Sequence, residues 1–201
     1  MIDNIKWLGH ASFRIEHNVI IYIDPWKLSS GPAADLILIT HEHFDHFSPN
    51  DIEKVRTDDT IIVGPKTCAG TIQPMRTVKQ LDVISAAGLR VEATPAYNIN
   101  KPFHPRSDDR VGYLIEIDNQ NIYHAGDTDH IPEMKNIKCD IALLPVSGKY
   151  VMTPEEAARA VDDLRCRYAI PMHYGDIVGS EENARRFKEL ADCEVRILEK
   201  S

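Results

Sequence analysis

The apolar run at 35–40, DLILIT, constrains the fold more than any other stretch, because it leads directly into the cluster HEHFDH. A continuous apolar run of this length is typical of a short strand that is buried on both faces. A loop that follows such a strand has a rigid base and lies at the surface, where binding and catalytic residues concentrate. The sequence therefore predicts a functional site at the end of this strand.

The cluster has the composition of a metal site. His41, His43, Asp45 and His46 offer imidazole and carboxylate groups, which are good ligands for zinc and neighbouring transition metals. Crowded imidazoles repel one another once they are protonated, whereas a shared cation removes that repulsion. The alternative, a polar loop that is rich in histidine by chance, is disfavoured by the position directly after a buried strand.

Similar apolar runs recur along the chain and predict an α/β fold. The expected strands are 5–16, 19–24, 35–40, 60–65, 89–97, 111–118, 120–127, 140–146 and 168–174. Two helices are expected after the caps Thr153 and Ser180, and a weaker helix is expected near 49–55. Asp127 and His173 also end short apolar strands. Because strand ends at one edge of a sheet converge, we expect both residues to join the histidine cluster.

Four motifs in order resemble the metallo-β-lactamase superfamily. HEHFDH matches its HxHxDH signature, and Asp24-Pro25, HAGDTD (124–129) and PMHYG (171–175) follow its order. WLGHASF and LLPVSGKYVMTPEEAA are similar to its compact metal-dependent hydrolase branch, which includes ascorbate-6-phosphate lactonase and N-acyl-phosphatidylethanolamine phospholipase D. The resemblance implies one domain over 1–201, folded as a four-layer αββα sandwich with a two-metal site at one edge.

The resemblance also implies a ligand set. It assigns His41 and His43 to the first metal, Asp45, His46 and His173 to the second, and Asp127 to a bridging position. Asp24 is implied to orient the ligand loop by hydrogen bonding without binding metal. The free carboxylate oxygen of Asp45 is implied to accept or relay a proton.

One position departs from the family pattern. The similar hydrolases carry another first-site histidine in a Pro-Ala-aromatic-His segment, whereas this chain has Asn98 after Pro95-Ala96-Tyr97. Asn98 is a weak neutral oxygen donor, and His104 follows it by six residues in the irregular segment 95–110. Three alternatives stay open: His104 is a ligand or substrate contact, Asn98 is a ligand, or neither residue has such a role.

Several other side chains have both a functional and a structural explanation. Those that could contact the site, the substrate or its entrance are His10, His124, Asp129, His130, Lys149, Tyr150 and Tyr174. For His124 the packing role is favoured, because alternate strand residues point to opposite faces. For Lys149 a solvated surface position is favoured over contact with a substrate anion.

The expected activity is metal-dependent hydrolysis. One or two Zn²⁺ ions, or else Mn²⁺, Fe²⁺ or Ni²⁺, would lower the pKa of bound water towards 7 and supply hydroxide. The substrate is expected to be an ester, lactone, amide or phosphodiester of a small molecule. The alternatives are a non-catalytic metal-binding protein and a nuclease or phosphodiesterase of the same fold.

Composition bounds the remaining functions. The net charge is −8 and no block of basic residues occurs, so nucleic acid is not an expected partner. No apolar run reaches the ~20 residues of a membrane span, and the N-terminus lacks the pattern of a secretory signal. The four cysteines are far apart without a CxxC motif, so we expect reduced thiols and a cytoplasmic protein.

Overall fold

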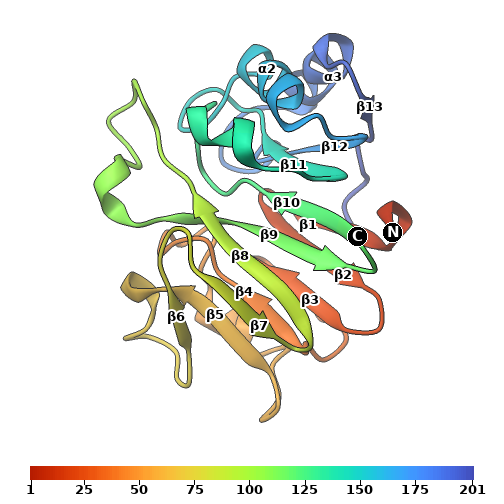
Figure 1. Cartoon of the computed structure of the whole chain (residues 1–201). Coiled ribbons are helices and arrows are strands. Elements are labelled where there is room, and N and C mark those ends of the chain that lie inside the picture. The colour runs from red at the N-terminus through yellow and green to blue at the C-terminus, as the bar shows by residue number, and fades with distance from the viewer.

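The computed structural model describes residues 1–201 as two mixed β-sheets that pack face to face (Figure 1). The first sheet has six strands in sequential order: β1 (Ile5–Gly9), β2 (Ser12–Glu16), β3 (Ile20–Ile23), β4 (Leu36–Leu38), β5 (Ile61–Pro65) and β6 (Arg76–Val78). The second has seven, in the order β13 (Glu194–Val195), β12 (Tyr168–Met172), β11 (Ile141–Pro145), β10 (Gln120–His124), β9 (Val111–Ile117), β8 (Leu89–Pro95) and β7 (Val83–Ala86).

The central strands of the first sheet, β3 and β4, are apolar on both faces. Ile21 and Ile23 of β3 belong to the main core of 47 buried residues, which fills the space between the sheets and continues under the helices. Tyr22 points the other way, into a second core of 12 residues on the outer face. This alternation is the period of two that a strand imposes, and burial on both sides explains the unbroken apolar runs of the sequence.

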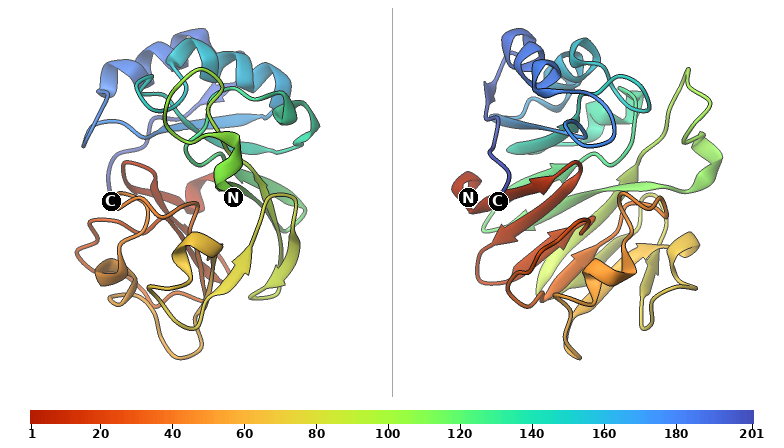
Figure 2. Two further views of the ribbon diagram at one scale, coloured as in Figure 1. Left: turned by 90° about the vertical axis from the view of Figure 1, so that its left-hand side faces the viewer. Right: turned by 180° about the vertical axis from the view of Figure 1, so that it is seen from behind.

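Helices cover the two outer faces unequally, as Figure 2 shows. α2 (Pro154–Leu164) and α3 (Glu181–Leu190) cover the second sheet beside β11 and β12. The first sheet is covered by the single-turn α1 (Pro49–Ile52), the 3₁₀ turn η2 (Lys66–Cys68) and loops. The remaining 3₁₀ turns are η1 (Ile2–Asn4), η3 (Arg106–Asp108) and η4 (Pro132–Asn136). The αββα sandwich is confirmed, with one thin outer layer.

Two turns show where the strand prediction held and where it was wrong. The expected hairpin around Asn119 is confirmed, with positive φ angles of 49° at Asp118 and 60° at Asn119. The segment 5–16, expected as one strand, is split into β1 and β2. The split is a tight turn in which Gly9 has φ +108° and His10 has φ +53°, and apolar residues on both sides of it concealed the break.

The N-terminus of α2 carries the expected capping box, and this feature gives a stability prediction. The Thr153 hydroxyl accepts from the Glu156 backbone N–H at 3.2 Å, and the Glu156 carboxylate accepts from the Thr153 N–H at 2.8 Å. We expect Thr153→Ala to lower the free energy of unfolding by about 1 kcal/mol. Urea unfolding measures the change, with the exposed Thr71→Ala as the matched control. An equal effect of both substitutions would contradict a role for the cap.

Two further observations concern the whole chain. No helix combines the length and the apolar character that crossing a bilayer requires. All four cysteines are free, and Cys68, Cys139 and Cys166 are buried.

Candidate metal centre

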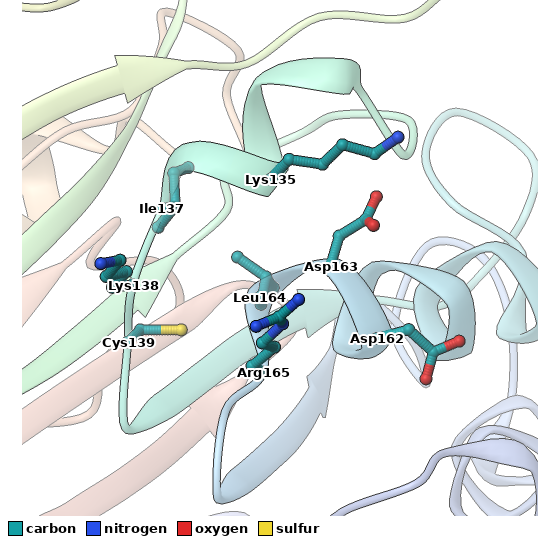
Figure 3. Close-up of a pocket in the computed structure, with 8 residues that line it drawn as sticks. All are labelled: Lys135, Ile137, Lys138, Cys139, Asp162, Asp163, Leu164 and Arg165. Atoms are coloured by element: carbon teal, nitrogen blue, oxygen red, sulfur yellow. The ribbon is translucent and has the colours of Figure 1, made fainter.

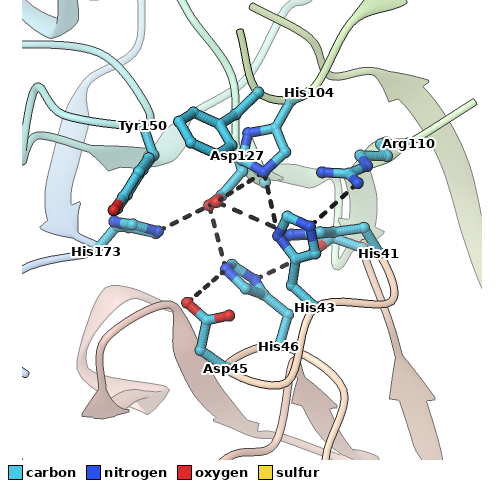
Figure 4. A network of polar contacts seen from close by, with 12 residues as sticks. His41, His43, Asp45, His46, His104, Arg110, Asp127, Tyr150 and His173 are labelled. Carbon is cyan, nitrogen blue, oxygen red and sulfur yellow. Dashed lines mark hydrogen bonds and ion pairs between the residues drawn. The ribbon is translucent and has the colours of Figure 1, made fainter. Parts of the chain in front are cut away.

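The predicted ligands meet at one edge of the sandwich because the strands that precede them end there. His41, His43, Asp45 and His46 lie in the loop after β4, and Asp127 and His173 follow β10 and β12. β4 runs parallel to its neighbours β3 and β5, and β10 runs parallel to β11, which runs parallel to β12. Figure 4 shows the side chains of both sheets converging on Asp127. The expected convergence is therefore present.

Asp127 is the centre of this arrangement. Its carboxylate lies 3.1 Å from Nε2 of His173, 3.3 Å from Nε2 of His46, 3.6 Å from Nε2 of His104 and 3.9 Å from Nε2 of His41. All of these groups are buried. A single carboxylate that faces four imidazoles from both sheets has the position expected of a bridging ligand.

The donor atoms form three groups, each with all its members within 4.8 Å of one another. One contains His41, His43 and His104; the second contains His10, Asp45, His46 and His173; the third contains His41, His46 and Asp127. The first two correspond to the two metal positions that the family resemblance implied, and the third joins them.

His104 enters the site from the irregular loop and occupies the place that the sequence left open. Its Nε2 lies 3.3 Å from Nδ1 of His43, and its backbone has φ +56°. The Asn98 amide nitrogen donates to the backbone carbonyls of Phe103 at 2.9 Å and Tyr150 at 2.6 Å, and it lies 3.5 Å from Nδ1 of His104. Its Oδ1 is buried without a hydrogen-bond partner. His104 belongs to the first donor group, which favours it as the third donor, and Asn98 links the two loops that carry Phe103 and Tyr150.

His10 is a member of the site that the sequence left undecided. It lies in the β1–β2 turn, and its Nε2 is 3.0 Å from Oδ2 of Asp45. Its ring centroid is 4.0 Å from that of His173, whose backbone N–H donates to the His10 carbonyl at 2.8 Å. The sequence signals were a histidine directly after a glycine between two apolar segments and the likeness of WLGHASF to the hydrolase branch.

A hydrogen-bond chain behind the site fixes which histidine nitrogens face the cavity. Asp24 accepts from the Thr40 backbone N–H at 2.7 Å, the Thr40 hydroxyl at 2.6 Å and His46 Nδ1 at 2.7 Å. Thr40 Oγ1 lies 3.0 Å from His41 Nδ1 and accepts a hydrogen bond from it, because its own proton is directed at Asp24. We therefore assign Nδ1–H to His41 and His46, so that Nε2 is the ring atom of each that faces the cavity. This is the orienting role expected for Asp24.

The buried polar atoms of the site fit divalent cations. His41 Nε2, His46 Nε2 and Asp127 Oδ1 are buried without a hydrogen-bond partner. Burial of an unpaired polar atom is costly, and metal coordination removes that cost. Imidazole and carboxylate donors are also the set that zinc and its neighbours prefer. The donors thus match the group that the family resemblance implies.

Electrostatics favours a cation as well. Burial holds the pKa of His41 well below 6.5 and lowers the pKa of His104 to about 4, so both imidazoles are neutral donors. Burial alone would lower the pKa of His46, but Asp127 and Asp24 raise it well above the ordinary value. Burial raises the pKa of Asp127, but His173 and His46 lower it by more, so the pKa lies well below its ordinary value. Asp127 and Asp24 therefore favour positive charge between the donor groups, which a bound cation would supply.

Arg110 extends the first donor group outwards. Its Nη2 lies 2.7 Å from a carboxylate oxygen of Glu42 and 3.2 Å from His43 Nε2. Burial and the Arg110 charge both lower the pKa of His43. Glu42 acts in the opposite direction on that pKa, so burial and Arg110 together favour a neutral His43. The sequence did not indicate the Arg110–Glu42 pair, because 68 positions separate the two residues.

The other candidate residues mostly lie outside the site. His124 Nε2–H donates to the Ala11 carbonyl, 2.9 Å away, and His124 is a packing residue as expected. His130 pairs with Asp163 at 2.8 Å, and Asp129 pairs with Lys101. Tyr174 stacks on Trp7 with centroids 4.9 Å apart, and Lys149 lies over the Tyr150 ring at 5.1 Å.

A cavity of about 240 Å³ opens onto the donor groups and is lined by His43, Phe44, Asp45, Phe103, His104, Asp127, Tyr150, His173 and Ile177. A larger cavity of about 500 Å³ lies between η4 and α2, beside Lys135, Asp163 and Arg165 (Figure 3). None of the three donor groups lines that larger cavity. The smaller cavity is therefore the candidate site.

Comparison with known proteins agrees with the fold and the donor set. The family model of the beta-lactamase superfamily domain matches residues 4–173. The chain therefore belongs to the metallo-β-lactamase superfamily, as its four motifs predicted.

Within the superfamily, its relatives are metal-dependent hydrolases of the UPF0173 group. A member from Methanopyrus kandleri is 34% identical and aligns over 97% of this chain and 96% of its own length. A crystal structure of a candidate metal-dependent hydrolase from Parabacteroides distasonis has a TM-score of 0.85 and 35% identity, and covers 97% of this chain and 93% of its own. Igni18, a metallo hydrolase from Ignicoccus hospitalis, has a TM-score of 0.79 at 25% identity and covers 98% and 95%.

Proposed function

We propose that this protein is a binuclear hydrolase that uses two Zn²⁺ ions to cleave a carboxylic ester, lactone, amide or phosphodiester of a small molecule. One observation carries the proposal: Asp127 lies between two groups of buried or partly buried donors, with His41, His43 and His104 on one side and Asp45, His46 and His173 on the other. Mn²⁺, Fe²⁺ and Ni²⁺ accept the same donors. The four free cysteines support a cytoplasmic location.

The bound ions would lower the pKa of a water molecule towards 7 and polarise the scissile carbonyl or phosphoryl group. The residues of the chain hold and orient the reactants around them. Asp45 lines the cavity. Burial raises the pKa of its carboxyl, but the hydrogen bond from His10 outweighs burial and the pKa falls to about 2. An ionised Asp45 can accept a proton from the attacking water, and His10 holds that carboxylate in place.

Elemental analysis and hydrolysis assays test the proposal together. We expect the purified full chain to retain two divalent ions and to hydrolyse at least one member of a panel of esters, lactones, amides and phosphodiesters. Chelation should abolish that activity, and re-addition of Zn²⁺ should restore it. A chain that binds both ions and hydrolyses no member of the panel would instead support the non-catalytic alternative. A chain that retains no divalent ion would overturn the metal assignment.

The role of His104 gives a separate prediction. We expect His104→Ala to reduce bound metal from two ions to about one, because the first group then keeps only His41, His43 and the bridging carboxylate. Metal content by mass spectrometry measures the change. His130→Ala is the matched control, since this histidine pairs with Asp163 outside the site. Unchanged metal content in His104→Ala would exclude His104 as a ligand.

A further inference from the structure

Apolar side chains gather at the mouth of the candidate site. Phe44, Phe103 and Ile177 are 69%, 45% and 42% exposed, and all three line the cavity together with Tyr150. They come from three separate loops, after β4, after β8 and after β12. Large apolar side chains in one exposed place mark a surface that binds something apolar.

One wall of the cavity is held in place before any ligand arrives. The rings of Phe103 and Tyr150 meet edge to face, with centroids 4.9 Å apart and an interplanar angle of 88°. Asn98 donates to the backbone carbonyls of both residues. A wall fixed in this way loses little conformational entropy on binding, which favours affinity for a complementary apolar group. Figure 4 shows Tyr150 beside His173, at the edge of the donor groups.

No lysine or arginine lines this cavity. Its only acidic residues are Asp45 and Asp127, which belong to the metal centre. Two basic side chains of adjacent loops are paired with carboxylates, Lys101 with Asp129 and Arg110 with Glu42, and Lys149 lies over the Tyr150 ring without lining the cavity. A charged group on the non-reacting part of a substrate would therefore lose its water without gaining a partner.

The cavity is also small. Its volume of about 240 Å³ lies below the ~300–1,000 Å³ that hold drug-sized ligands. The apolar part of the substrate is therefore limited to about the size of a phenyl ring or a short alkyl chain.

We propose that the substrate is a small uncharged carboxylic ester, lactone or amide, whose apolar part packs on Phe103 and Tyr150 while its carbonyl reaches the metal centre. This proposal rests on the proposed function and narrows it, because it disfavours phosphodiesters and substrates with a second, anionic group. Phe44, Phe103 and Ile177 are then the residues that determine selectivity.

A matched pair of esters tests the proposal on the zinc-loaded full chain. Phenyl acetate and 4-acetoxybenzoate share the scissile bond and differ by one carboxylate. We expect kcat/KM, corrected for the background rate of each ester, to be at least about tenfold higher for phenyl acetate. Bis(4-nitrophenyl) phosphate should be a poorer substrate than either ester. A preference for 4-acetoxybenzoate or for the phosphodiester would overturn the proposal.

Two variants locate the selectivity. Phe103→Ala should raise KM for phenyl acetate about tenfold and leave kcat within about threefold, because it removes binding that substrate and transition state share. Ile177→Arg should raise kcat/KM for 4-acetoxybenzoate at least about fivefold by supplying the missing cation. Val83→Ala and Leu81→Arg, at exposed positions that do not line the cavity, are the controls. Equal behaviour of variants and controls would exclude this wall as the binding surface.

A binding measurement separates this proposal from the proposed function. Phenylacetone and its 4-carboxylate copy the two esters without a cleavable bond, and calorimetry measures their binding to the zinc-loaded chain. Binding of phenylacetone alone, without hydrolysis of any ester, would support the substrate class and overturn the hydrolase. Hydrolysis that favours the carboxylated ester would leave the hydrolase standing and overturn the substrate class. Binding of neither ketone, with no hydrolysis, would overturn both.

Discussion

Replacement of Asp127 by alanine is expected to lower kcat/KM by at least about 10³-fold and to release bound metal. Asp127 is the one carboxylate that lies within 4 Å of His41, His46, His104 and His173. Without it, both donor groups lose their shared anionic ligand, and the first group keeps only imidazoles while the second keeps Asp45 as its one carboxylate. Metal content by mass spectrometry and the hydrolysis assay measure the two losses separately.

Asp163→Ala is the matched control, because Asp163 also pairs with a histidine but lies on α2, away from the cavity. It should keep both metal and activity. Circular dichroism and urea unfolding show whether each variant is folded before its metal content is compared. An Asp127→Ala protein that is folded, holds two ions and hydrolyses substrate at the wild-type rate would refute the bridging assignment.

Asp24 is expected to give the second large effect, and two substitutions separate its two roles. Asp24→Ala should lower the free energy of unfolding by about 3–5 kcal/mol, because it strands the buried partners at Thr40 and His46. Asp24→Asn keeps the shape and can still accept from the Thr40 N–H. Its amide nitrogen is a donor, however, so it places the His46 proton on Nε2, the atom that faces the cavity.

We therefore expect Asp24→Asn to lose less stability than Asp24→Ala and still to bind Zn²⁺ about 10–100-fold more weakly than the wild type. Competition with a coloured chelator measures the affinity, and urea unfolding of the metal-free proteins measures stability. Asp51→Asn is a useful control, because Asp51 is also a mostly buried carboxylate that accepts backbone N–H groups, from Lys27 and Leu28, outside the site. Wild-type affinity in Asp24→Asn would show that Asp24 does not select the tautomer.

The strand ends are the part of the site that the sequence could predict. His41 to His46, Asp127 and His173 each follow a short apolar run, and parallel strands of one sheet bring their carboxyl ends to one edge. The same runs predicted buried strands, because burial on both faces removes the alternation that a solvated strand shows, whereas the sandwich itself was implied by the family resemblance. Local sequence was sufficient here because the position of each residue depends on the strand directly before it.

His104 and His10 were beyond such reasoning, because their positions depend on contacts between distant segments. The path of the loop that carries His104 is fixed by Asn98, whose backbone N–H bonds to the His104 carbonyl and whose side chain bonds to Tyr150, 52 positions away. His10 reaches Asp45 only because the chain reverses with a positive φ between β1 and β2. The hydrophobic periodicity of the sequence contains no sign of either contact.

The donors around Asp127 come from both sheets, and this division has a mechanical consequence. His41, His43, Asp45 and His46 are carried by the first sheet, whereas His104, Asp127 and His173 are carried by the second. A cation held by both sets would cross-link the two sheets, so the sheets could separate at this edge only after the cation dissociates. With a metal bound, hydrolytic activity and resistance to separation of the sheets would be coupled, because separating the sheets at this edge would also break the metal site.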